Sequence, residues 1–305
     1  MAVLIIKYLT VDARNYFKPI KEESMSIKLI IKIIVFTQVL LIVACTSTQS
    51  LRAPQGLLTR HEIDNCGVGC PTGSGSDEIL IRETYTLNNS AATKFANWVA
   101  YKITRTTQAS GRPRHWKTDP DLPAADTLDP EDYQGASKVL NIDRGHQAPL
   151  ASLAAATDWP SLNYLSNITP QKAMLNQGAW AKLENQERIL ANRTDIRAVY
   201  TVTGPLYERN MGTLPNAKKP HRIPSGYWKI IFINQSPAVN HYATFILDQD
   251  TPASANFCDF QATVKDVERR TGLVIWSSLP TEIQSSLKST PGVLSEQMGC
   301  APLKA

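Results

Sequence analysis

Histidine is scarce in this sequence, with five residues among 305, and the five are scattered along the chain. A zinc-type phosphoesterase holds its ions with several histidine and acidic ligands, which this composition does not supply. The sequence also has no internal repeats and no break in composition after Gly75. These absences argue against a repeat protein and favour one globular domain behind a leader segment.

A strong excess of positive charge is also missing from most of the chain. The formal net charge is +5, but residues 1–44 carry six lysines and arginines against three acidic residues. The rest of the chain therefore carries only about +2, which is too little to indicate a polyanionic partner by itself. Binding to nucleic acid has to come from a local cluster of basic residues.

The apolar run from Ile27 to Ala44 contains two lysines near its start, and its uninterrupted part is too short for a stable membrane-spanning helix. Such a run is typical of a secretory signal peptide. The preceding 24 residues do not resemble one, so we expect translation to start at Met25 and residues 1–24 to be an untranslated extension. Residues 25–57 are then a signal peptide and a flexible leader.

Two interpretations remain open for the end of the signal peptide. Ile42-Val43-Ala44-Cys45 resembles a bacterial lipoprotein box, in which Cys45 is acylated and tethers the protein to a membrane. Ile42 replaces the usual leucine of such a box, and the alternative is ordinary cleavage near residues 44–47 or near Leu57. We favour ordinary cleavage and a protein that is secreted or periplasmic.

Cysteine is rare, at five residues, and Cys45 falls in the signal region. The remaining four are Cys66, Cys70, Cys258 and Cys300, which allow three pairings. We expect a local disulfide, Cys66–Cys70, and a distal one, Cys258–Cys300, formed in an oxidising compartment. A zinc site at Cys66 and Cys70 is the alternative, but no second pair of ligands accompanies it.

Strand-like and helix-like segments alternate from Ile79 onward. We predict strands over 78–87, 97–103, 198–203, 228–233 and 241–247, and helices over 263–270 and from Pro280. The polar segment 107–134 has no periodicity, and loops of this length usually serve function. The pattern predicts an α+β fold, with a single domain over 58–305 in which helices flank a mainly antiparallel central sheet.

The segment Asp143-Arg144-Gly145-His146-Gln147 carries the clearest chemistry. Thirty residues later a predicted helix carries Asn176, Glu184 and Arg188. A histidine without a serine or cysteine nucleophile beside it suggests a general base that activates water. A carboxamide and a carboxylate on the helix suggest a weakly held hard cation. Together they predict metal-assisted hydrolysis of a phosphodiester.

We place the start of that helix at Thr169, as N-cap, and Pro170, as its first residue. A buried stripe follows at helical spacing, formed by Leu175, Ala179, Leu183, Gln186 and Leu190. A second stripe is expected to face a cleft, and it is formed by Asn176, Trp180, Glu184 and Arg188.

Asn176 and Glu184 are roughly 12 Å apart along an ideal helix, too far to share one ion directly. We therefore assign Asn176 as the Mg²⁺ ligand, with Mn²⁺ as an alternative ion, and Glu184 as the group that holds a metal-bound water. A neutral amide leaves the ion its charge for the scissile phosphate, and it does not favour the charged form of His146 as nearby carboxylates would. Arg114 is expected to stabilise the charge that develops on the phosphate.

Each of these features also has a plainer interpretation. The Asp143–His146 segment could be a turn with a local ion pair, and Glu184 with Arg188 an ordinary i,i+4 surface pair. A module that binds nucleic acid without cutting it is the competing class of function. The joint occurrence of His146, Asn176 and Glu184 in an exported chain favours an enzyme.

Four stretches carry a resemblance that spans roughly residues 65–300: Asp143-Arg-Gly-His146, Asn167-Ile-Thr-Pro-Gln171, Leu175-Asn-Gln-Gly-Ala-Trp180 and Leu183-Glu184. They resemble the sugar-non-specific DNA/RNA endonuclease family, whose catalytic core is a ββα-metal site. The resemblance implies cleavage of single- and double-stranded DNA and RNA, with 5′-phosphate products, by a homodimer.

The same resemblance implies a role for individual residues. It makes His146 the general base, Asn176 the metal ligand, Glu184 a helper acting through metal-bound water and Arg114 the phosphate stabiliser. Five more residues match supporting positions, namely Asp143, Arg144, Asn167, Gln171 and Arg188.

Overall fold

The computed structural model describes residues 63–75, 77–234 and 241–302. The chain divides into two units after Leu57, and all of the described residues belong to the second unit, Leu58–Ala305. The expectations for Met25, the signal region and Cys45 therefore lie outside the described residues. Within the described ranges, no helix is both long and apolar enough to span a bilayer.

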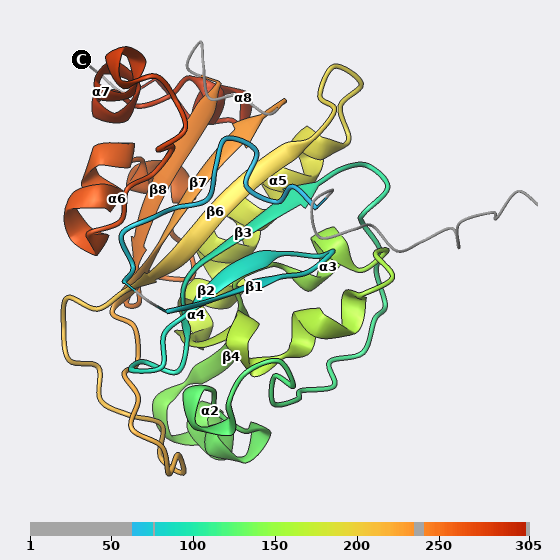
Figure 1. Ribbon diagram of the computed structural model, residues 1–305, viewed down its shortest axis with the longest axis vertical. Coiled ribbons are helices and arrows are strands. Elements are labelled where there is room, and N and C mark those ends of the chain that lie inside the picture. Colours follow the sequence, from blue (N-terminus) through green and yellow to red (C-terminus); the bar gives the residue numbers. More distant parts are fainter. Residues whose placement is uncertain (1–62, 76, 235–240, 303–305) are drawn as a thin grey trace, which may run out of the picture. The chain divides into compact units, whose positions relative to one another are not determined.

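A six-stranded sheet forms the centre of this unit, and every strand pairing in it is antiparallel (Figure 1). Its order is β1 (Glu78–Ile81), β2 (Thr86–Asn89), β3 (Ala96–Ile103), β6 (Val199–Leu206), β7 (Gly226–Ile233) and β8 (Tyr242–Asp248). The last four confirm the strands predicted there. The single strand predicted over 78–87 is wrong, because the chain reverses at Arg82–Tyr85 to form a hairpin closed by the Arg82 N–H and the Tyr85 carbonyl at 2.8 Å.

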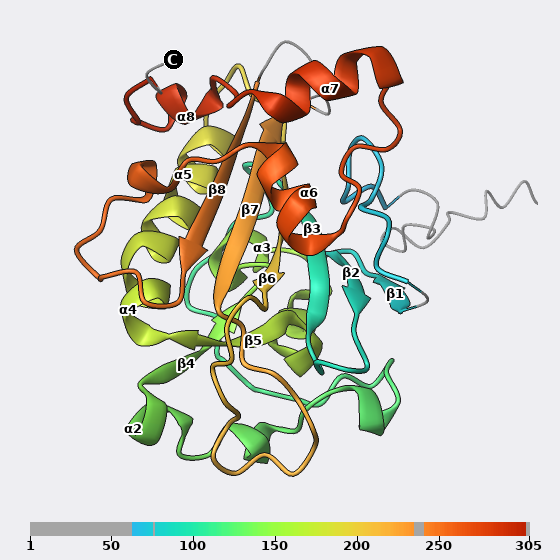
Figure 2. The same ribbon diagram turned by 90° about the vertical axis from the view of Figure 1, so that its left-hand side faces the viewer.

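Both faces of the sheet are covered, so β6 and β7 are buried along their whole length. One core layer packs β3, β6 and β7 against α5 (Ala181–Ala191), and the other packs them against α6 (Val264–Thr271) and α7 (Thr281–Ser289). Figure 2 shows α5 and α6 on opposite sides of the sheet. The predicted helix 263–270 is confirmed, with Thr263 as N-cap and Gly272 in the left-handed conformation after its last turn.

A second sheet of two antiparallel strands, β4 (Ile142–His146) and β5 (Ile168–Lys172), lies outside the large one. The helix start predicted at Thr169 and Pro170 is therefore wrong. The Pro170 carbonyl accepts hydrogen bonds from Tyr227 and Gln249, so it points away from β4. The Pro170 nitrogen points the same way, and its missing N–H removes no bond from the β4–β5 ladder.

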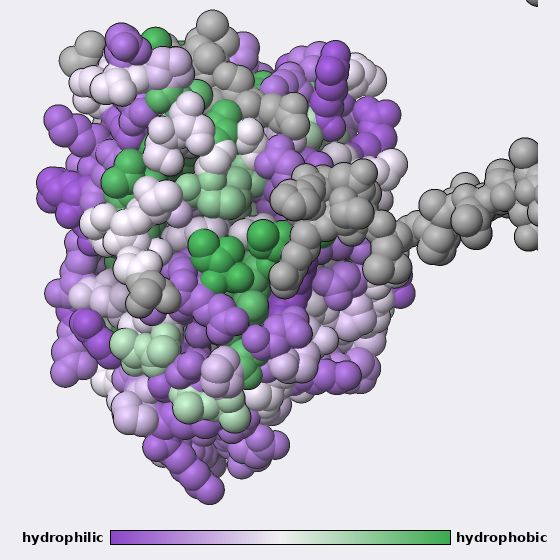
Figure 3. Space-filling view, viewed as in Figure 1, coloured by the Kyte–Doolittle hydropathy of each residue, from purple (hydrophilic) through white to green (hydrophobic). Residues whose placement is uncertain are grey.

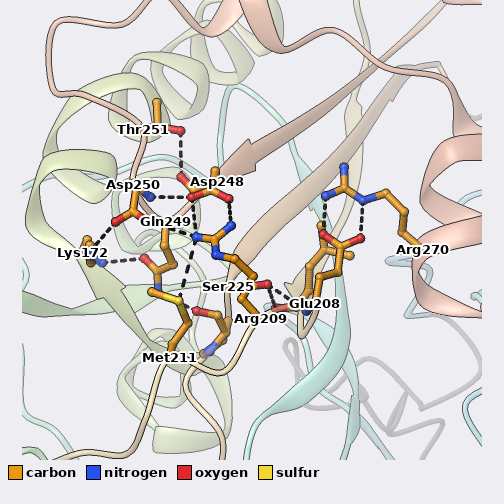
Figure 4. A network of polar contacts seen from close by, with 12 residues as sticks. Lys172, Glu208, Arg209, Met211, Ser225, Asp248, Gln249, Asp250, Thr251 and Arg270 are labelled. Carbon is orange, nitrogen blue, oxygen red and sulfur yellow. Dashed lines mark hydrogen bonds and ion pairs between the residues drawn. The ribbon is translucent and has the colours of Figure 1, made fainter.

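The side chain of Gln249 anchors the outer edge of β5 to the large sheet (Figure 4). Its Nε2 donates to the Pro170 carbonyl at 2.8 Å and to the Pro224 carbonyl at 3.0 Å, and its Oε1 accepts from the Lys172 N–H at 2.8 Å. The buried amide thus pairs with β5 as a neighbouring strand would. An exposed ion pair between Lys172 and Asp250 lies beside it.

The helical segment after β5 is interrupted. It runs through α4 (Ala173–Leu175), one wide turn over Asn176–Trp180 and α5. Gly178 leaves helical geometry in the wide turn, and a Cβ there would lie 2.8 Å from the backbone of Ala253. The order β4, β5, helix makes this the ββα unit that the resemblance implied.

The residues of this segment that face the core differ from the prediction at few positions. Leu175, Ala179, Leu183 and Leu190 are buried as predicted, but Gln186 is not, and Glu187 takes the buried place. Trp180 was predicted to face the cleft and is buried instead. Gln186 and Glu187 each lie one turn from both Leu183 and Leu190, so helical spacing alone does not decide which of the two is buried.

Three short helices lie outside the sheets: α2 (Ala136–Leu140), α3 (Leu150–Leu153) and α8 (Leu294–Gln297). The long polar segment contains two single turns of 3₁₀-helix, Ala124–Asp126 and Pro130–Tyr133. Both expected disulfides, Cys66–Cys70 and Cys258–Cys300, are formed. The face in Figure 3 is mainly hydrophilic around smaller apolar areas, as expected when the two core layers use most of the large apolar residues.

Candidate active site

One cleft of about 940 Å³ is bordered by β4, α2, the start of α3 and the helical segment after β5. Seven of the nine predicted site residues line it, namely Arg114, Asp143, Arg144, His146, Asn176, Glu184 and Arg188. Residues separated by 74 positions in the chain thus meet around a single space. The other two, Asn167 and Gln171, lie behind its wall.

His146 is held from two sides. Its Nε2 lies 3.2 Å from Oδ1 of Asn163, and Nδ2 of Asn163 donates to the Pro113 carbonyl at 3.1 Å. Because that second bond needs the amide nitrogen, the amide oxygen faces the imidazole and assigns the proton to Nε2. The Trp116 ring packs against His146, with ring centroids 5.3 Å apart. This arrangement leaves Nδ1 as the basic nitrogen.

Burial lowers the pKa of His146 to about 4, since desolvation disfavours the imidazolium. The hydrogen bond to Asn163 opposes this change in pKa, and the positive charge of Arg114 adds to it. The imidazole is therefore neutral at pH 7, the form that a general base requires.

The Asp143 carboxylate organises the start of the helical segment. One of its oxygens, Oδ2, accepts hydrogen bonds from Nδ2 of Asn176 and from Nε2 of Gln177, both at 2.8 Å. These bonds fix the Asn176 amide so that its Oδ1 has no hydrogen-bond partner among the described residues. The free oxygen is available to a ligand.

The donors around the cleft are oxygen atoms of Asn176, Asp143 and Glu184. No group of three or more histidine, cysteine, aspartate or glutamate side chains close enough to hold a metal ion occurs among the described residues. Mg²⁺ keeps most of its waters and needs few protein oxygens, whereas a zinc site needs three or four nitrogen, sulfur or carboxylate ligands. The donor set fits a hard, largely hydrated cation.

Glu184 stands in the cleft wall on α5 and is partly buried. Desolvation is the main cause that raises its pKa to about 7, and Glu187 raises it further. Lys229, Arg188 and the Trp180 indole oppose this rise because they favour the carboxylate. Glu184 therefore changes its charge near neutral pH.

The cleft presents several guanidinium groups. Arg144 is stacked between the rings of Trp116 and Tyr133, at 5.6 and 5.1 Å, and its Nη2 donates to the Pro130 carbonyl. Arg188 lies 3.3 Å from the Ser152 hydroxyl. Arg114 is exposed and has no hydrogen-bond or ion-pair partner in the described part of the chain. Together they form the local positive cluster that the net charge does not reveal.

Asn167 and Gln171 brace the wall from behind. The Asn167 side chain bonds to both the N–H and the carbonyl of Ala148, and to the Leu162 carbonyl, which fixes the turn after His146. The Gln171 side chain crosses Gly145, where a Cβ would lie 2.5 Å from its Oε1 and 2.8 Å from its Cβ. The glycine of the Asp-Arg-Gly-His segment is thus required by close packing.

Sequence reasoning missed Asn163, Trp116 and Tyr133. Asn163 follows His146 by 17 residues in a segment without periodicity, so no spacing marks it as a partner. Trp116 has a weak signal, because it stands two residues after Arg114 in the polar segment that we expected to serve function. Its contact with His146 depends on the fold.

Residues 62–282 match the family model described as "DNA/RNA non-specific endonuclease". The chain is 66% identical to the "Nuclease" of Serratia marcescens over 242 residues, which are 79% of this chain and 91% of that protein. It is 26% identical to mitochondrial endonuclease G of Homo sapiens over 227 residues, 66% of this chain and 70% of that protein.

A crystal structure of the EndoG/EndoGI complex has the same fold, with a TM-score of 0.59 and 22% identity, covering 74% of this chain and 94% of that chain. The predicted α+β fold with a ββα-metal core is confirmed, as is the prediction of a nuclease. The chain belongs to the DNA/RNA non-specific endonuclease family.

Proposed function

We propose that the protein hydrolyses phosphodiester bonds of single- and double-stranded DNA and RNA at this cleft, with Mg²⁺ as cofactor and water activated by His146. One observation is the main support for assigning His146 as the base and Asn176 as the metal ligand. A neutral histidine with its proton fixed on Nε2 lines the same cleft as an asparagine with a free amide oxygen. The family is one of metal-dependent nucleases, and the choice of Mg²⁺ rests on the oxygen donor set.

His146 acts on the attacking water. Its Nδ1 takes a proton from the water as the water oxygen forms a bond to phosphorus, and Asn163 stabilises the resulting imidazolium through Nε2. The bond between phosphorus and the 3′-oxygen breaks, and the departing 3′-oxygen takes a proton from water in the cleft, which leaves a 5′-phosphate and a 3′-hydroxyl. Trp116 keeps the imidazole plane in place during the transfer.

Asn176 would hold the cation through Oδ1, and Asp143 would keep that amide oriented. When bound, the cation neutralises charge on the scissile phosphate and on the leaving oxygen. Glu184, in its ionised form, would orient water in the same cleft. Mn²⁺ offers the same oxygen preference and is the expected substitute.

Arg114 is proposed to stabilise the charge that develops on the phosphate, because its guanidinium is exposed at the cleft and has no other partner among the described residues. Arg144 and Arg188 would contact neighbouring phosphates. All of these contacts address the backbone of the substrate, and the cleft contains no element that reads bases or the 2′-hydroxyl within the described ranges. This supports activity on both sugars.

A digestion assay tests the proposal. Plasmid DNA and total RNA should both be cut in the presence of Mg²⁺ and left intact with EDTA. His146→Ala should lose several orders of magnitude of activity while the protein stays folded. Asn176→Ala should lose activity and regain part of it at high Mg²⁺. Equal activity of His146→Ala and the parent, or activity that ignores EDTA, would refute the mechanism.

We further propose that residues 58–305 are the nuclease domain, that residues 25–57 are removed or serve as a leader, and that the mature protein is a secreted or periplasmic homodimer. The two disulfides support an oxidising compartment. Dimer formation rests on the family resemblance, and sedimentation equilibrium tests it.

Lipidation at Cys45 is the alternative fate of the leader. A lipid-anchored protein should move from the membrane fraction to the soluble fraction on Cys45→Ser. We expect both forms in the soluble fraction, because the box has Ile42 in place of leucine. Membrane association of the parent that Cys45→Ser abolishes would establish the anchor.

A further inference from the structure

The candidate cleft extends beyond the groups assigned to hydrolysis. One part of its wall is formed by α2 and the turn before it, over residues 134–138, and the proposed mechanism uses none of them. A cleft of about 940 Å³ lies at the upper end of the range that encloses a drug-sized ligand, so it has room for more than the scissile phosphodiester. The α2 end of the cleft is therefore available to another part of the substrate.

Basic side chains are spread across the cleft from one end to the other. Figures 1 and 2 both show α2 and α5 on opposite sides of β4. In the same order, Lys138 lies on α2, Arg144 on β4 and Arg188 on α5. The lysines and arginines that line the cleft are Arg114, Lys138, Arg144 and Arg188, and the carboxylic acids are Asp143 and Glu184. A strand that carries one phosphate per nucleotide matches such a spread of cations better than a single phosphate group does.

The short helix α2 is held at both of its ends. The flanking residues Gly135 and Asn141 have positive φ angles of 77° and 53°. Before the helix, the Gln134 carbonyl accepts a hydrogen bond from Nδ2 of Asn216 at 2.6 Å. After the helix, the Asn141 carbonyl accepts from the N–H of Ala173, the first residue of α4, at 2.9 Å. These contacts orient the exposed side of α2 relative to the cleft.

Lys138 is the cation at this end of the cleft, and it is exposed. Its ammonium has no hydrogen-bond or ion-pair partner among the residues that the structure describes, so no carboxylate there neutralises it. Ser137 and Gln134 are exposed in the same wall, and their hydroxyl and amide groups can donate hydrogen bonds. A lysine binds phosphate as a point charge, without the fixed fork of a guanidinium, and therefore suits a phosphate whose orientation the chemistry does not fix.

We propose that the α2 end of the cleft is a phosphate-binding subsite, in which Lys138 contacts a backbone phosphate of the substrate strand away from the scissile bond. Ser137 and Gln134 add hydrogen bonds to the same phosphate. The proposal rests on the proposed function, because it concerns the strand that the cleft would hold. The subsite tightens substrate binding and takes no part in the bond-breaking step. The alternative is a solvated lysine that contributes only to the net charge of the protein.

The loss of one phosphate contact has a defined effect on binding. A cation that neutralises one phosphate of a single strand displaces counterions, so removing it should lower the slope of log K against log[salt] by ~0.7. At roughly 0.1 M salt this change of slope corresponds to about fivefold weaker binding. Lys138→Met should show both effects, and Lys138→Arg, which keeps the positive charge, should show neither.

The test measures the binding of a fluorescein-labelled single strand of about twelve nucleotides by fluorescence anisotropy at several salt concentrations. The full-length protein is used with Mg²⁺, and every sample carries His146→Ala so that the strand stays uncut. Lys265→Met is the matched control, because Lys265 is exposed on α6, which lies on the other side of the large sheet from α5 (Figure 2). Both substitutions remove one positive charge, and we expect the weaker binding and the lower slope only in Lys138→Met.

Steady-state kinetics with His146 restored gives a second measurement. In Lys138→Met, KM for the same strand should rise about fivefold and kcat should stay the same, since a contact away from the scissile bond contributes equally to ground state and transition state. A fall in kcat at unchanged KM would overturn the proposal, because it would place Lys138 in the bond-breaking step. Equal affinity and slope in Lys138→Met and the parent, or an equal loss in Lys265→Met, would overturn it too.

The behaviour of the parent separates this proposal from the proposed function. If the parent binds and cuts the strand and Lys138→Met does so equally well, the subsite is wrong and the proposed function stands. If the parent neither binds nor cuts the strand, the proposed function is wrong, and the subsite is wrong with it.

Discussion

At the scale of single residues, the reactivity of His146 depends on groups that hydrogen-bond or pack against it. The Asn163 amide is fixed by the Pro113 carbonyl, and it in turn determines which imidazole nitrogen carries the proton. Trp116 covers one side of the ring and contributes to the desolvation that keeps the histidine neutral. A histidine acts as a general base at Nδ1 only when an acceptor, here the Asn163 amide oxygen, holds the proton on Nε2.

The titration of His146 tests this arrangement. Because the pKa is lowered to about 4, the imidazole signal in the metal-free protein should titrate near pH 4 rather than near 6.5. Asn163→Asp places a carboxylate against Nε2, which favours the imidazolium, so the midpoint should move upward. The measurement is ¹H–¹⁵N NMR of the ring, and a midpoint that stays in place in Asn163→Asp would show that Asn163 is not the partner.

The same pKa has a consequence for stability. The unfolded chain binds a proton at this histidine below pH 6.5, whereas the folded protein does so only below about 4. The free energy of unfolding therefore decreases as pH falls from 6.5 to 4, because only the unfolded state gains a proton at His146 in this interval. His146→Gln, which does not titrate, should lose less stability over this interval than the parent.

Much of the site was predictable at this scale because its residues stand in two short segments. Asp143, Arg144 and His146 come from one strand, and Asn176, Glu184 and Arg188 from one helical segment, so local spacing places them on neighbouring faces. Asn163 and Trp116 reach the site through loops. Only the tertiary fold brings them there, and no periodicity in the chain marks them.

At the scale of elements, β5 shows how tertiary contacts override local signals. Thr169 followed by Pro170 is a good helix start in sequence, but Ile168 to Lys172 pair with β4 instead. The strand is favoured because its free edge is completed by the Gln249 amide and the Tyr227 hydroxyl. A residue 77 positions after Lys172 supplies that edge, which no local rule could anticipate.

The substitution Gln249→Leu tests whether the Gln249 side chain stabilises the outer edge of β5. The substitution keeps the volume and removes the partners of the Lys172 N–H and the Pro224 carbonyl, so unfolding free energy should fall by about 2–3 kcal/mol. Because β5 carries Gln171 and pairs with the strand of His146, activity should fall as well. Gln297→Leu on the exposed surface is the control for urea denaturation, and equal losses in the two variants would argue against the anchor.

At the scale of the whole molecule, the site combines a large central sheet with a small separate sheet, and the two are held in different ways. The six-stranded sheet is packed on both faces, and β6 pairs with two neighbours along most of its length. The small β4–β5 sheet carries the proposed catalytic base, and the side chains of Tyr227 and Gln249 join it to the large sheet. Five strand-like segments were enough to predict a mainly antiparallel large sheet. The separate small sheet was implied only by the family resemblance and not by local patterns, because strand pairing is a long-range property.

The two disulfides are expected to stabilise the fold to different extents. Cys258–Cys300 joins residues 42 positions apart and ties the segment after α8 to the one that follows β8. Cys66–Cys70 joins residues only four positions apart. Because a disulfide restricts the unfolded chain more when it closes a longer loop, the distal bond should stabilise the fold by ~4 kcal/mol and the local one by ~2 kcal/mol. Urea denaturation of Cys258→Ser/Cys300→Ser and of Cys66→Ser/Cys70→Ser measures both values. A larger loss from the local pair would mean that native packing around Gly67, and not chain entropy, sets the contribution of that disulfide.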